Sequence, residues 1–407
     1  MPIIKNFYQH SNLIKHHIIH GALSISDLSD LIKRSIPSVT KIVNELVAEG
    51  ILKEDGVRSS NGGRRPATFS LVNNMVYILS VAVNQRTTRL AIVDIGNHNI
   101  IEEVEFKLDL YNHEYDAQKL ADGVKGFLEK TNVPADNILA AEVTMPGFVD
   151  AKLGTNNSFL KPPYGTLADY LTDEVGLQVF IDNDSTAIAL AEQKFGDASA
   201  AKNSMIINLG WGVGLGMIMN GQIFRGHSGY AGEFSHLALF RNGKVCRCGK
   251  YGCLETEASL LAIEEKAREG VRAGSNTSLS TYQNISFDDI IEESLRGDAF
   301  CIKIISEAAY SVGQGLAILI HLMNPESIIL SGKGSVLDKL WMAPIQQALN
   351  EHCILQLTSD VNLLVSKLGA NAQFYGGLVL IAENLQYITP RPGADKQPVA
   401  LGDEIYN

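Results

Sequence analysis

The sequence predicts a mixed α/β protein in which an N-terminal winged helix-turn-helix precedes a body of two α/β lobes. Three short helical patterns followed by a basic hairpin occupy residues 1–72. The rest of the chain falls into two halves. Each half opens with closely spaced strand patterns and continues into alternating helix and strand patterns, which indicates two lobes of similar plan. The 407 residues and 45% hydrophobic content are enough for two or three domains with real cores.

The helical patterns of the head have recognisable ends. Residues 6–20 carry apolar side chains at helical spacing, and Gly21 stops the pattern. Ser26 is the expected N-cap of the second helix, and Pro37 suits the first turn of a third helix that ends at Gly50. Two short helices joined by a tight turn, after a supporting helix, are typical of a helix-turn-helix.

The outward face of the third helix predicts contact with DNA, because small polar and basic groups there can reach base edges or phosphates. The residues expected to make these contacts are Ser35, Ser38, Lys41 and Asn44. Two extended patterns then flank VRSSNGGRRP, which predicts a hairpin with a basic tip. Its Arg64 and Arg65 are expected to touch the DNA backbone or minor groove, as a wing does.

Charge supports the same division of the chain. The formal net charge is −11, yet residues 1–72 contain nine Lys/Arg against six Asp/Glu. A mildly basic head on an acidic body indicates that only the head approaches phosphates. The chain contains neither an 18-residue apolar run nor a secretory pattern, and its five cysteines are an odd number. We therefore expect a cytoplasmic protein with no membrane partner.

His16 and His20 lie four residues apart on the first predicted helix, where one face could present both to a metal ion. No cysteine or carboxylate accompanies them on that face, so a solvated helix surface is expected instead.

The body opens at Tyr77 with YILSVAV, RLAIVDI and IIEEVEFKL, which predict an antiparallel meander. A helix over 116–130, the strands ILAAEVTMPG and LQVFIDND, and the helix STAIALAEQKF follow. The second series starts at residue 204 with SMIINLG, GVGLGMIMNG and QIF, and continues into helices near 259–270 and 300–322 and the strand SIILSG. The predicted domains are a winged helix-turn-helix over 1–72, a small lobe over 73–195 plus 376–407, and a large lobe over 196–375.

The loop between His236 and Glu255 gathers three of the five cysteines within eight residues. Three thiolates and one imidazole are a sufficient tetrahedral set for Zn²⁺, and the spacing H-x9-C-x-C-x4-C lets one loop wrap one ion. The predicted ligands are His236, Cys246, Cys248 and Cys253. With all four positions filled by protein, this zinc would be structural, and it would fix a loop too small to hold itself by packing.

Residues 1 to about 388 resemble the ROK family of repressors, open reading frames and sugar kinases. The most specific match is GEFSHLALFRNGKVCRCGKYGCLE, which follows the family pattern G-E-x-x-H and then C-x-C-G-x-x-G-C-x-E. The resemblance implies a two-lobed actin/hexokinase-like (ribonuclease H-like) ATPase-type fold, to which the family's repressors add an N-terminal winged helix.

The resemblance also implies a sugar pocket lined by Glu233, His236 and Glu255, in which His236 would bind zinc through one ring nitrogen and face the ligand with the other. The segment IDNDSTAIALAE resembles the family's E-N-D-x-N-A-x-A-L-G-E, which places Asn183 and Asp184 on the sugar, although Thr186 departs from the pattern. Two alternatives stay open from the residues alone. Asp184 could simply cap the helix over 185–195, and the two glutamates could be solvated loop charges.

The segments that hold ATP in the family's kinases are altered. Ala82 stands where the resemblance expects an aspartate, and Asn84 and Gln85 replace two glycines. In LGWGVGLG the glycines remain, but Trp211 replaces a hydroxyl residue, and Lys333 intrudes into ILSGKGS. Phosphate positioning supplies most of the catalysis in phosphoryl transfer, so no catalytic residue and no enzymatic activity are expected.

The resulting hypothesis is a sugar-responsive transcriptional repressor that binds operator DNA as a homodimer, with a homotetramer also open. The inducer would be a sugar, amino sugar or sugar phosphate in the cleft between the lobes, and it would change the spacing of the recognition helices. Two alternatives remain. One is an ATP-dependent sugar kinase with a DNA-binding head, and the other is a regulator that senses a sugar-transport protein.

Overall fold

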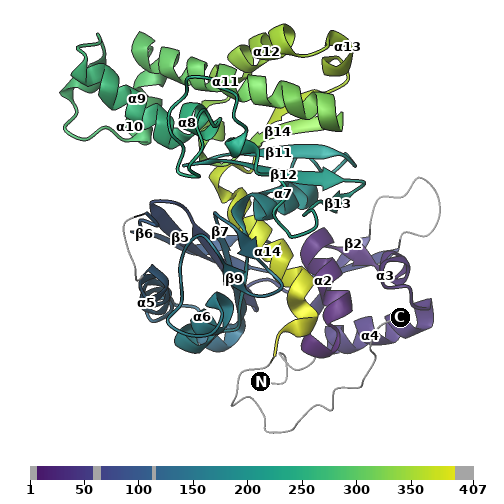
Figure 1. The fold of residues 1–407 in the computed structure, drawn as a ribbon. Helices are drawn as coiled ribbons and strands as arrows, with labels where there is room; N and C mark the ends of the chain where they lie inside the picture. The colour runs from purple at the N-terminus through teal and green to yellow at the C-terminus, as the bar shows by residue number, and fades with distance from the viewer. Residues whose placement is uncertain (1–6, 58–65, 112–115, 390–407) are drawn as a thin grey trace.

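The computed structural model describes residues 7–57, 66–111 and 116–389, and the description below refers to these residues (Figure 1). Its head is the predicted winged helix-turn-helix. The helices are α2 (Ser11–His20), α3 (Ile25–Ile32) and α4 (Ile36–Ala48), and the strands are β1 (Leu23–Ser24), β2 (Leu52–Val57) and β3 (Ala67–Leu71). The strands form one sheet in the order β1-β3-β2. Arg64 and Arg65 of the predicted wing tip lie outside the described residues.

The N-cap of α3 is Ser24, so the prediction of Ser26 was wrong. The Ser24 hydroxyl accepts a hydrogen bond from the Asp27 amide at 3.2 Å, and the Asp27 carboxylate accepts one from the Ser24 amide at 3.0 Å. This reciprocal pair is a capping box, with Asp27 at the third helical position. Ser26 lies one residue inside the helix and cannot play that role.

The two lobes contain sheets of the same topology, which confirms the predicted duplication. The first has the order β10-β7-β4-β5-β6, and the second has the order β13-β12-β11-β14-β15. In each sheet the first three strands in sequence form an antiparallel meander, and two parallel strands extend the other edge. The bounds of the first set are β4 (Tyr77–Val83), β5 (Thr87–Asp94), β6 (Ile100–Lys107), β7 (Ile138–Met145) and β10 (Val179–Asn183). Those of the second are β11 (Ser204–Leu209), β12 (Val213–Met219), β13 (Gln222–Ile223), β14 (Ser327–Ser331) and β15 (Asn362–Val365).

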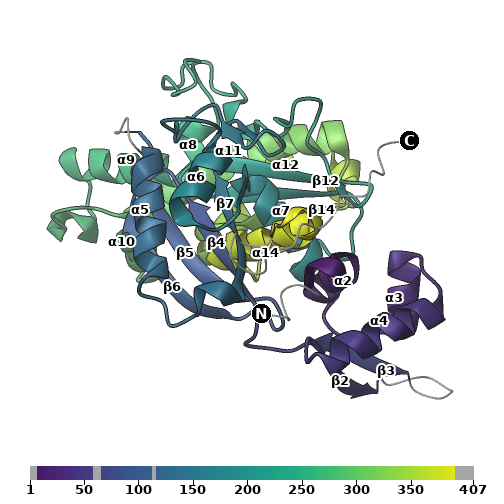
Figure 2. The ribbon, with the colours of Figure 1, turned by 90° about the horizontal axis from the view of Figure 1, so that it is seen from below.

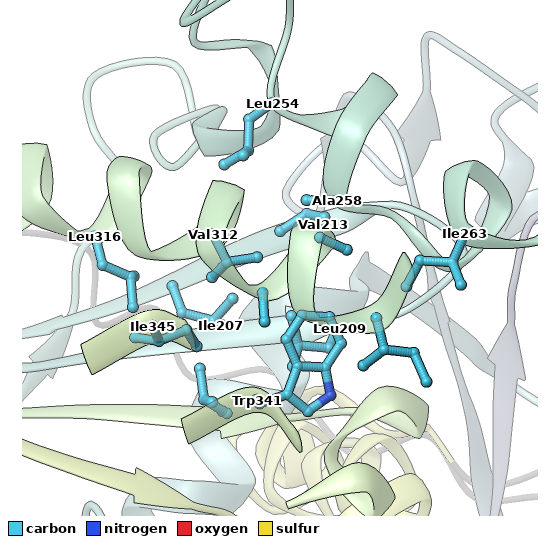
Figure 3. Packing of buried hydrophobic residues seen from close by; sticks show 14 of the residues in the cluster. Ile207, Leu209, Val213, Leu254, Ala258, Ile263, Val312, Leu316, Trp341 and Ile345 are labelled. Carbon is cyan, nitrogen blue, oxygen red and sulfur yellow. The ribbon is translucent and has the colours of Figure 1, made fainter. Parts of the chain in front are cut away.

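Helices cover both sheets. In the first lobe they are α5 (Asp116–Leu128) and α6 (Leu167–Val175), beside a short hairpin of β8 (Val149–Asp150) and β9 (Thr155–Asn156). In the second they are α8 (Glu255–Ala258), α9 (Leu260–Arg272), α10 (Phe287–Leu295), α11 (Ala299–Met323), α12 (Lys339–His352) and α13 (Leu355–Thr358). The core of the second lobe lies between β11, α8, α11 and α12, where Ile207, Val312 and Trp341 are buried together (Figure 3).

Two further helices lie at the centre of the molecule, α7 (Asp184–Phe195) and α14 (Ala372–Asn384) (Figure 1). Helix α7 packs on β11 and β12, and α14 packs on α7, β4, β7 and α2. The backbones approach closely, since a Cβ atom at Gly376 would lie 2.1 Å from the Ala187 carbonyl oxygen. The predicted domain boundary at residue 195 therefore assigns to the small lobe a helix that also packs on the second sheet. The boundaries themselves stay a prediction.

The head and the body share one hydrophobic core. Ile14 and Ile18 of α2 belong to the same buried cluster as Leu378 and Ile381 of α14. The His98 ring nitrogen Nε2 also donates to the Ile18 carbonyl at 2.7 Å. Figure 2 shows α2 against the body, with α3, α4 and the strands projecting beyond it. Helix α2 is therefore the structural link between the two parts. Among the described helices, none is both long and apolar enough to cross a bilayer.

Helix α2 buries one of its histidines, His17, while the solvated surface expected for His16 and His20 holds for His20 and only in part for His16. His17 is 2% exposed, its Nδ1 lies 3.0 Å from the Gly21 carbonyl oxygen, and its Nε2 has no partner. His16 also has a shielded ring nitrogen, while His20 remains exposed. Burial lowers the pKa of His17 to about 4, because a proton on Nε2 would place an unpaired charge in an apolar site.

We predict that acid destabilises the protein through His17. The unfolded side chain protonates near the ordinary histidine pKa of 6.5, whereas the folded one stays neutral down to a pKa of about 4. The stability that the neutral ring confers is therefore complete above pH 6.5 and is lost as the pH falls toward 4. Between pH 7.5 and 5, His17→Gln should reduce the loss of unfolding free energy by about 2 kcal/mol, measured by denaturant titration. His227→Gln, at an exposed position, should leave the loss unchanged. Equal losses in wild type and His17→Gln would contradict the assignment.

Candidate functional site

A cavity of about 590 Å³ lies between the lobes, and its lining brings together the predicted sugar-contacting residues. These residues are Asn183, Asp184, Glu233, His236 and Glu255. They come from the β10–α7 junction of one lobe and from the cysteine-containing loop of the other. Residues 72 positions apart in sequence thus line one cavity, although the Glu233 side chain is also 45% exposed. Contact of these residues with a sugar stays a prediction.

The β10–α7 junction positions the first pair. Asn183, and not Asp184, caps α7, because its side-chain oxygen accepts hydrogen bonds from the Ser185 and Thr186 amides at 3.0 and 3.1 Å. Asp184 is the first residue of the helix and is 9% exposed. Burial raises its pKa, while hydrogen bonds from Ser185 and Asn208 act in the opposite direction. Asp184 is therefore a nearly buried carboxyl group in the cavity lining, and Asn183 serves as the cap.

His236 lies between the two glutamates. Its Nε2 is 3.7 Å from a Glu233 carboxylate oxygen, and its Nδ1 is 3.6 Å from a Glu255 carboxylate oxygen. The Glu255 side chain is 21% exposed and begins helix α8, and the Glu233 side chain is 45% exposed. The two carboxylates can accept hydrogen bonds from a polyhydroxylated ligand from two sides, with the imidazole fixed between them.

The four predicted metal ligands also converge. One ligand atom each from His236, Cys246, Cys248 and Cys253 lies within 4.8 Å of the others. Cys246 Sγ is 3.6 Å from His236 Nδ1, and Cys248 Sγ is 3.5 Å from Cys253 Sγ. A tetrahedral ion with bonds of about 2.0–2.3 Å separates its ligand atoms by roughly 3.5–3.8 Å. The donor set fits a four-coordinate metal, with Nδ1 of His236 facing it and Nε2 facing the cavity.

Both ends of the cysteine loop are secured by the protein. Isolated β-bridges join Ala238 to Cys253 and Val245 to Tyr251. Directly after Cys253, Leu254 is fully buried in the core against α11 (Figure 3). The Cys253 thiol and the Glu255 carboxylate thus follow one another at the edge of the core. An ion held by this loop would therefore fix Glu255 and His236 relative to α11.

Several residues that line the cavity were not predicted. The Arg247 guanidinium lies 3.4 Å from the centre of the Tyr111 ring, so this cation–π contact crosses between the lobes. Asn157, which lies outside the lining, donates to the hydroxyl of the lining residue Tyr230 at 3.1 Å. Such pairs are separated by many residues and leave no local pattern. Asn208 donates to the Asp184 carboxylate at 3.2 Å. Its position as a polar residue at the end of an apolar strand was a weak indication in the sequence of a role in the site.

Two of the glycines of LGWGVGLG, Gly214 and Gly216, have a packing role in this structure. A Cβ atom at Gly214 would lie 1.9 Å from the Ser185 hydroxyl, and one at Gly216 would lie 2.5 Å from the Ser185 carbonyl oxygen. Both glycines let α7 approach β12 at close range. Their presence therefore follows from helix–strand packing and does not by itself indicate a phosphate site.

Trp211 lies between two cations beside the glycine segment. The Arg86 guanidinium is 4.8 Å and the Lys333 ammonium is 5.4 Å from its ring centre. Arg86 also pairs with the buried Glu264 carboxylate of α9 at 2.6 Å, and Lys333 pairs with Asp288 at 2.9 Å. These contacts join side chains of the two lobes beside the glycine segment.

Helix α4 presents the predicted DNA-contacting residues on one exposed face. Ser35 precedes the helix, and Ser38, Lys41 and Asn44 follow at spacings of three residues, all of them exposed. The Lys41 ammonium is 3.9 Å from a Glu45 carboxylate and its side chain is 79% exposed, so it is free to turn toward a phosphate.

Two lobes of duplicated topology around a shared cavity define the class of this protein as actin/hexokinase-like, here with a winged helix added. A model described as the ROK family matches residues 85–384, and the chain belongs to this family. It is 26% identical over 381 residues to the xylose repressor of Caldicellulosiruptor bescii, covering 92% of this chain and 95% of that protein.

Two solved structures confirm the fold class. One is a ROK family transcriptional regulator, a homologue of the E. coli MLC protein, with a TM-score of 0.73 and 27% identity over 94% of this chain and 97% of that chain. The other is a ROK family glucokinase from Streptomyces griseus in complex with glucose and AMPPNP, with a TM-score of 0.66 and 25% identity. It matches 75% of this chain and 98% of its own length.

Proposed function

We propose that this ROK family protein is a sugar-responsive transcriptional repressor that binds operator DNA as a homodimer and a sugar in the cavity between its lobes. The observation that carries the proposal is a continuous packed route from the cavity to the head. Asp184 begins α7 at the cavity, α7 packs on α14, and α14 shares a core with α2. A ligand that shifts α7 can therefore bias the position of the head.

The proposed DNA contacts are those of the recognition helix and the wing. Ser38, Lys41 and Asn44 would enter the major groove, with Ser35 at the helix start, and Arg64 and Arg65 would contact backbone or minor groove. Two heads related by two-fold symmetry would read two half-sites, so a homodimer is the minimal assembly. A homotetramer would present two such pairs.

The proposed sugar contacts are Asn183, Asp184, Glu233, His236 and Glu255. The proposed metal is a structural Zn²⁺ held by His236, Cys246, Cys248 and Cys253, the ligand set that zinc prefers. Zinc supplies no chemistry to the sugar. It fixes the His236 ring so that Nε2 faces the ligand, and it holds Glu255 at the cavity wall.

We propose that the chain is not a kinase. Phosphoryl transfer needs backbone amides around the phosphates and a carboxylate for the magnesium ion. Ala82 offers no carboxylate for that ion. The side chains of Gln85 and Glu255 crowd Gly212, since a Cβ atom at this glycine would lie 3.2 Å from the Gln85 amide nitrogen and 3.2 Å from a Glu255 carboxylate oxygen. The Trp211 ring, which contacts Arg86 and Lys333, adds bulk beside Gly212.

One set of measurements tests this proposal. Duplexes that bind the protein are selected from a random pool, and their affinity is measured by fluorescence anisotropy with and without xylose, glucose and N-acetylglucosamine. A coupled assay measures ATP consumption with the same sugars. We expect selected binding, release by at least one sugar, and no sugar-dependent ATP turnover. Turnover without DNA binding would establish a kinase instead, and DNA binding unaffected by every sugar would favour a regulator that senses a partner protein.

A further inference from the structure

The charge around the cavity narrows the class of ligand. From its lining we infer that the effector is an uncharged sugar and that the phosphate ester of the same sugar is excluded. This inference rests on the proposed sugar-sensing function and goes beyond it, because the resemblance alone leaves free sugars and sugar phosphates equally open.

The lining contains three carboxyl groups and very little positive charge. Asp184 is the least exposed of them, and Glu233 and Glu255 flank His236. Among the described residues that line the cavity, Arg247 is the sole lysine or arginine. It belongs to the exposed class and stacks on the Tyr111 ring, so it lies at the rim. Residues 112–115, which follow Tyr111 in sequence, contain no lysine or arginine.

A metal ion in the cysteine loop would not change this balance. Three thiolates and a neutral imidazole around a divalent cation leave the centre with a net charge of about −1. Nor does the inference depend on the protonation of the carboxyl groups. An ionised carboxylate repels a phosphate, and a neutral one adds no positive charge.

The backbone amides that usually receive anions are also engaged. The N-terminus of α7 opens on the cavity, and such a terminus is a ready anion site. Here Asn183 already accepts hydrogen bonds from the Ser185 and Thr186 amides, and Asp184 adds its own carboxylate to the Ser185 amide at 2.8 Å. In the glycine turn, the Gly210 amide donates to the Gly212 carbonyl at 3.0 Å. These three backbone donors, at the helix terminus and in the glycine turn, are therefore already satisfied by the protein's own groups.

The carboxyl groups suit hydroxyl donors instead. Each carboxylate oxygen can accept hydrogen bonds from neighbouring hydroxyls of a pyranose, and aromatic rings of Tyr111, Phe148 and Tyr230 offer flat apolar contact to its faces. The cavity of about 590 Å³ has room for a monosaccharide with solvent or a second ring.

The test compares each sugar with its own phosphate ester on the full-length protein. Calorimetry and operator release are measured with glucose and glucose 6-phosphate, xylose and xylose 5-phosphate, and N-acetylglucosamine and its 6-phosphate. For the pair that binds, the ester should bind on the order of 100-fold more weakly and should fail to release operator. An ester that binds as tightly as its sugar, or more tightly, overturns the inference. If no member of any pair binds while operator binding persists, the proposed sugar sensing itself is overturned.

Arg247 provides a second, independent readout. If the rim arginine received a phosphate, Arg247→Gln would weaken the ester selectively. We expect the ratio of the two dissociation constants, ester to free sugar, to be the same in Arg247→Gln as in the wild type. Arg241→Gln, an exposed position on the same loop outside the cavity lining, is the matched control. A selective loss of ester binding in Arg247→Gln alone would show that the cavity accepts phosphate.

Discussion

Replacement of Cys253 by serine should release the bound metal and abolish the response to sugar while operator binding remains. Cys253 is fully buried, and its neighbours in the chain connect the metal cluster to the core and to Glu255. Losing one of four ligands removes most of the folding free energy that a structural metal supplies. Metal content, measured by mass spectrometry, should fall from about one ion per chain to near zero. The free energy of unfolding should fall by more than about 3 kcal/mol.

Cys301→Ala is the matched control for this variant. Cys301 is equally buried, but it lies in α11 outside the metal cluster. It should keep the metal and the sugar response, with a modest loss of stability. A Cys253→Ser protein that retained stoichiometric metal and a normal sugar response would contradict the role assigned to this loop.

Asp184→Asn should weaken sugar binding by roughly 30- to 100-fold, with the fold and the metal intact. The amide keeps the shape of the carboxylate and can still accept from Ser185, but it no longer offers a charged acceptor to ligand hydroxyls. A hydrogen bond to a charged group contributes about 1.5–3 kcal/mol, which sets the size of the expected effect. Calorimetry with the sugar that releases operator gives the affinity directly.

An exposed aspartate of the same lobe controls for the change of charge. Asp122→Asn on α5 removes the same unit of charge outside the cavity lining and should bind sugar as the wild type does. Wild-type sugar affinity in Asp184→Asn would show that the Asp184 carboxylate does not contact the sugar, and it would support a purely structural role at the β10–α7 junction.

The fold was predictable wherever local patterns were strong. The three helices of the head, both meanders and α11 follow from periodicity and from turn residues. Helix α14 was not predicted, because it is buried on nearly every face and its apolar residues show no single stripe. The two-residue strand β1 is too short to leave a pattern. Ser24 is the N-cap in place of Ser26 because Asp27 lies three residues after Ser24 and so completes a capping box with it.

The candidate site was predictable where the ligands are close in sequence. The spacing of His236 and the three cysteines is itself the signal, and the structure brings their ligand atoms together. Contacts between the lobes were not predictable in the same way. Arg247 over Tyr111 and Arg86 with Glu264 join residues more than 130 positions apart, and only the folded chain places them side by side.

The packed route from cavity to head also explains why the ligand need not approach DNA. Under the proposed function, a ligand at Asp184 and the capped end of α7 would shift α7, and α14 would pass that shift to α2, because α14 packs on both helices. Close backbone contact at Gly376 leaves little room for independent motion of the two helices.

Reciprocal binding tests the central claim, that the cavity and the head are energetically coupled. The affinity for the releasing sugar is measured by calorimetry on the free protein and on the protein saturated with its selected duplex. We predict that duplex weakens sugar binding by the same factor, about 5- to 150-fold, by which sugar weakens duplex binding. Equal sugar affinity in the presence and absence of duplex would contradict the claim.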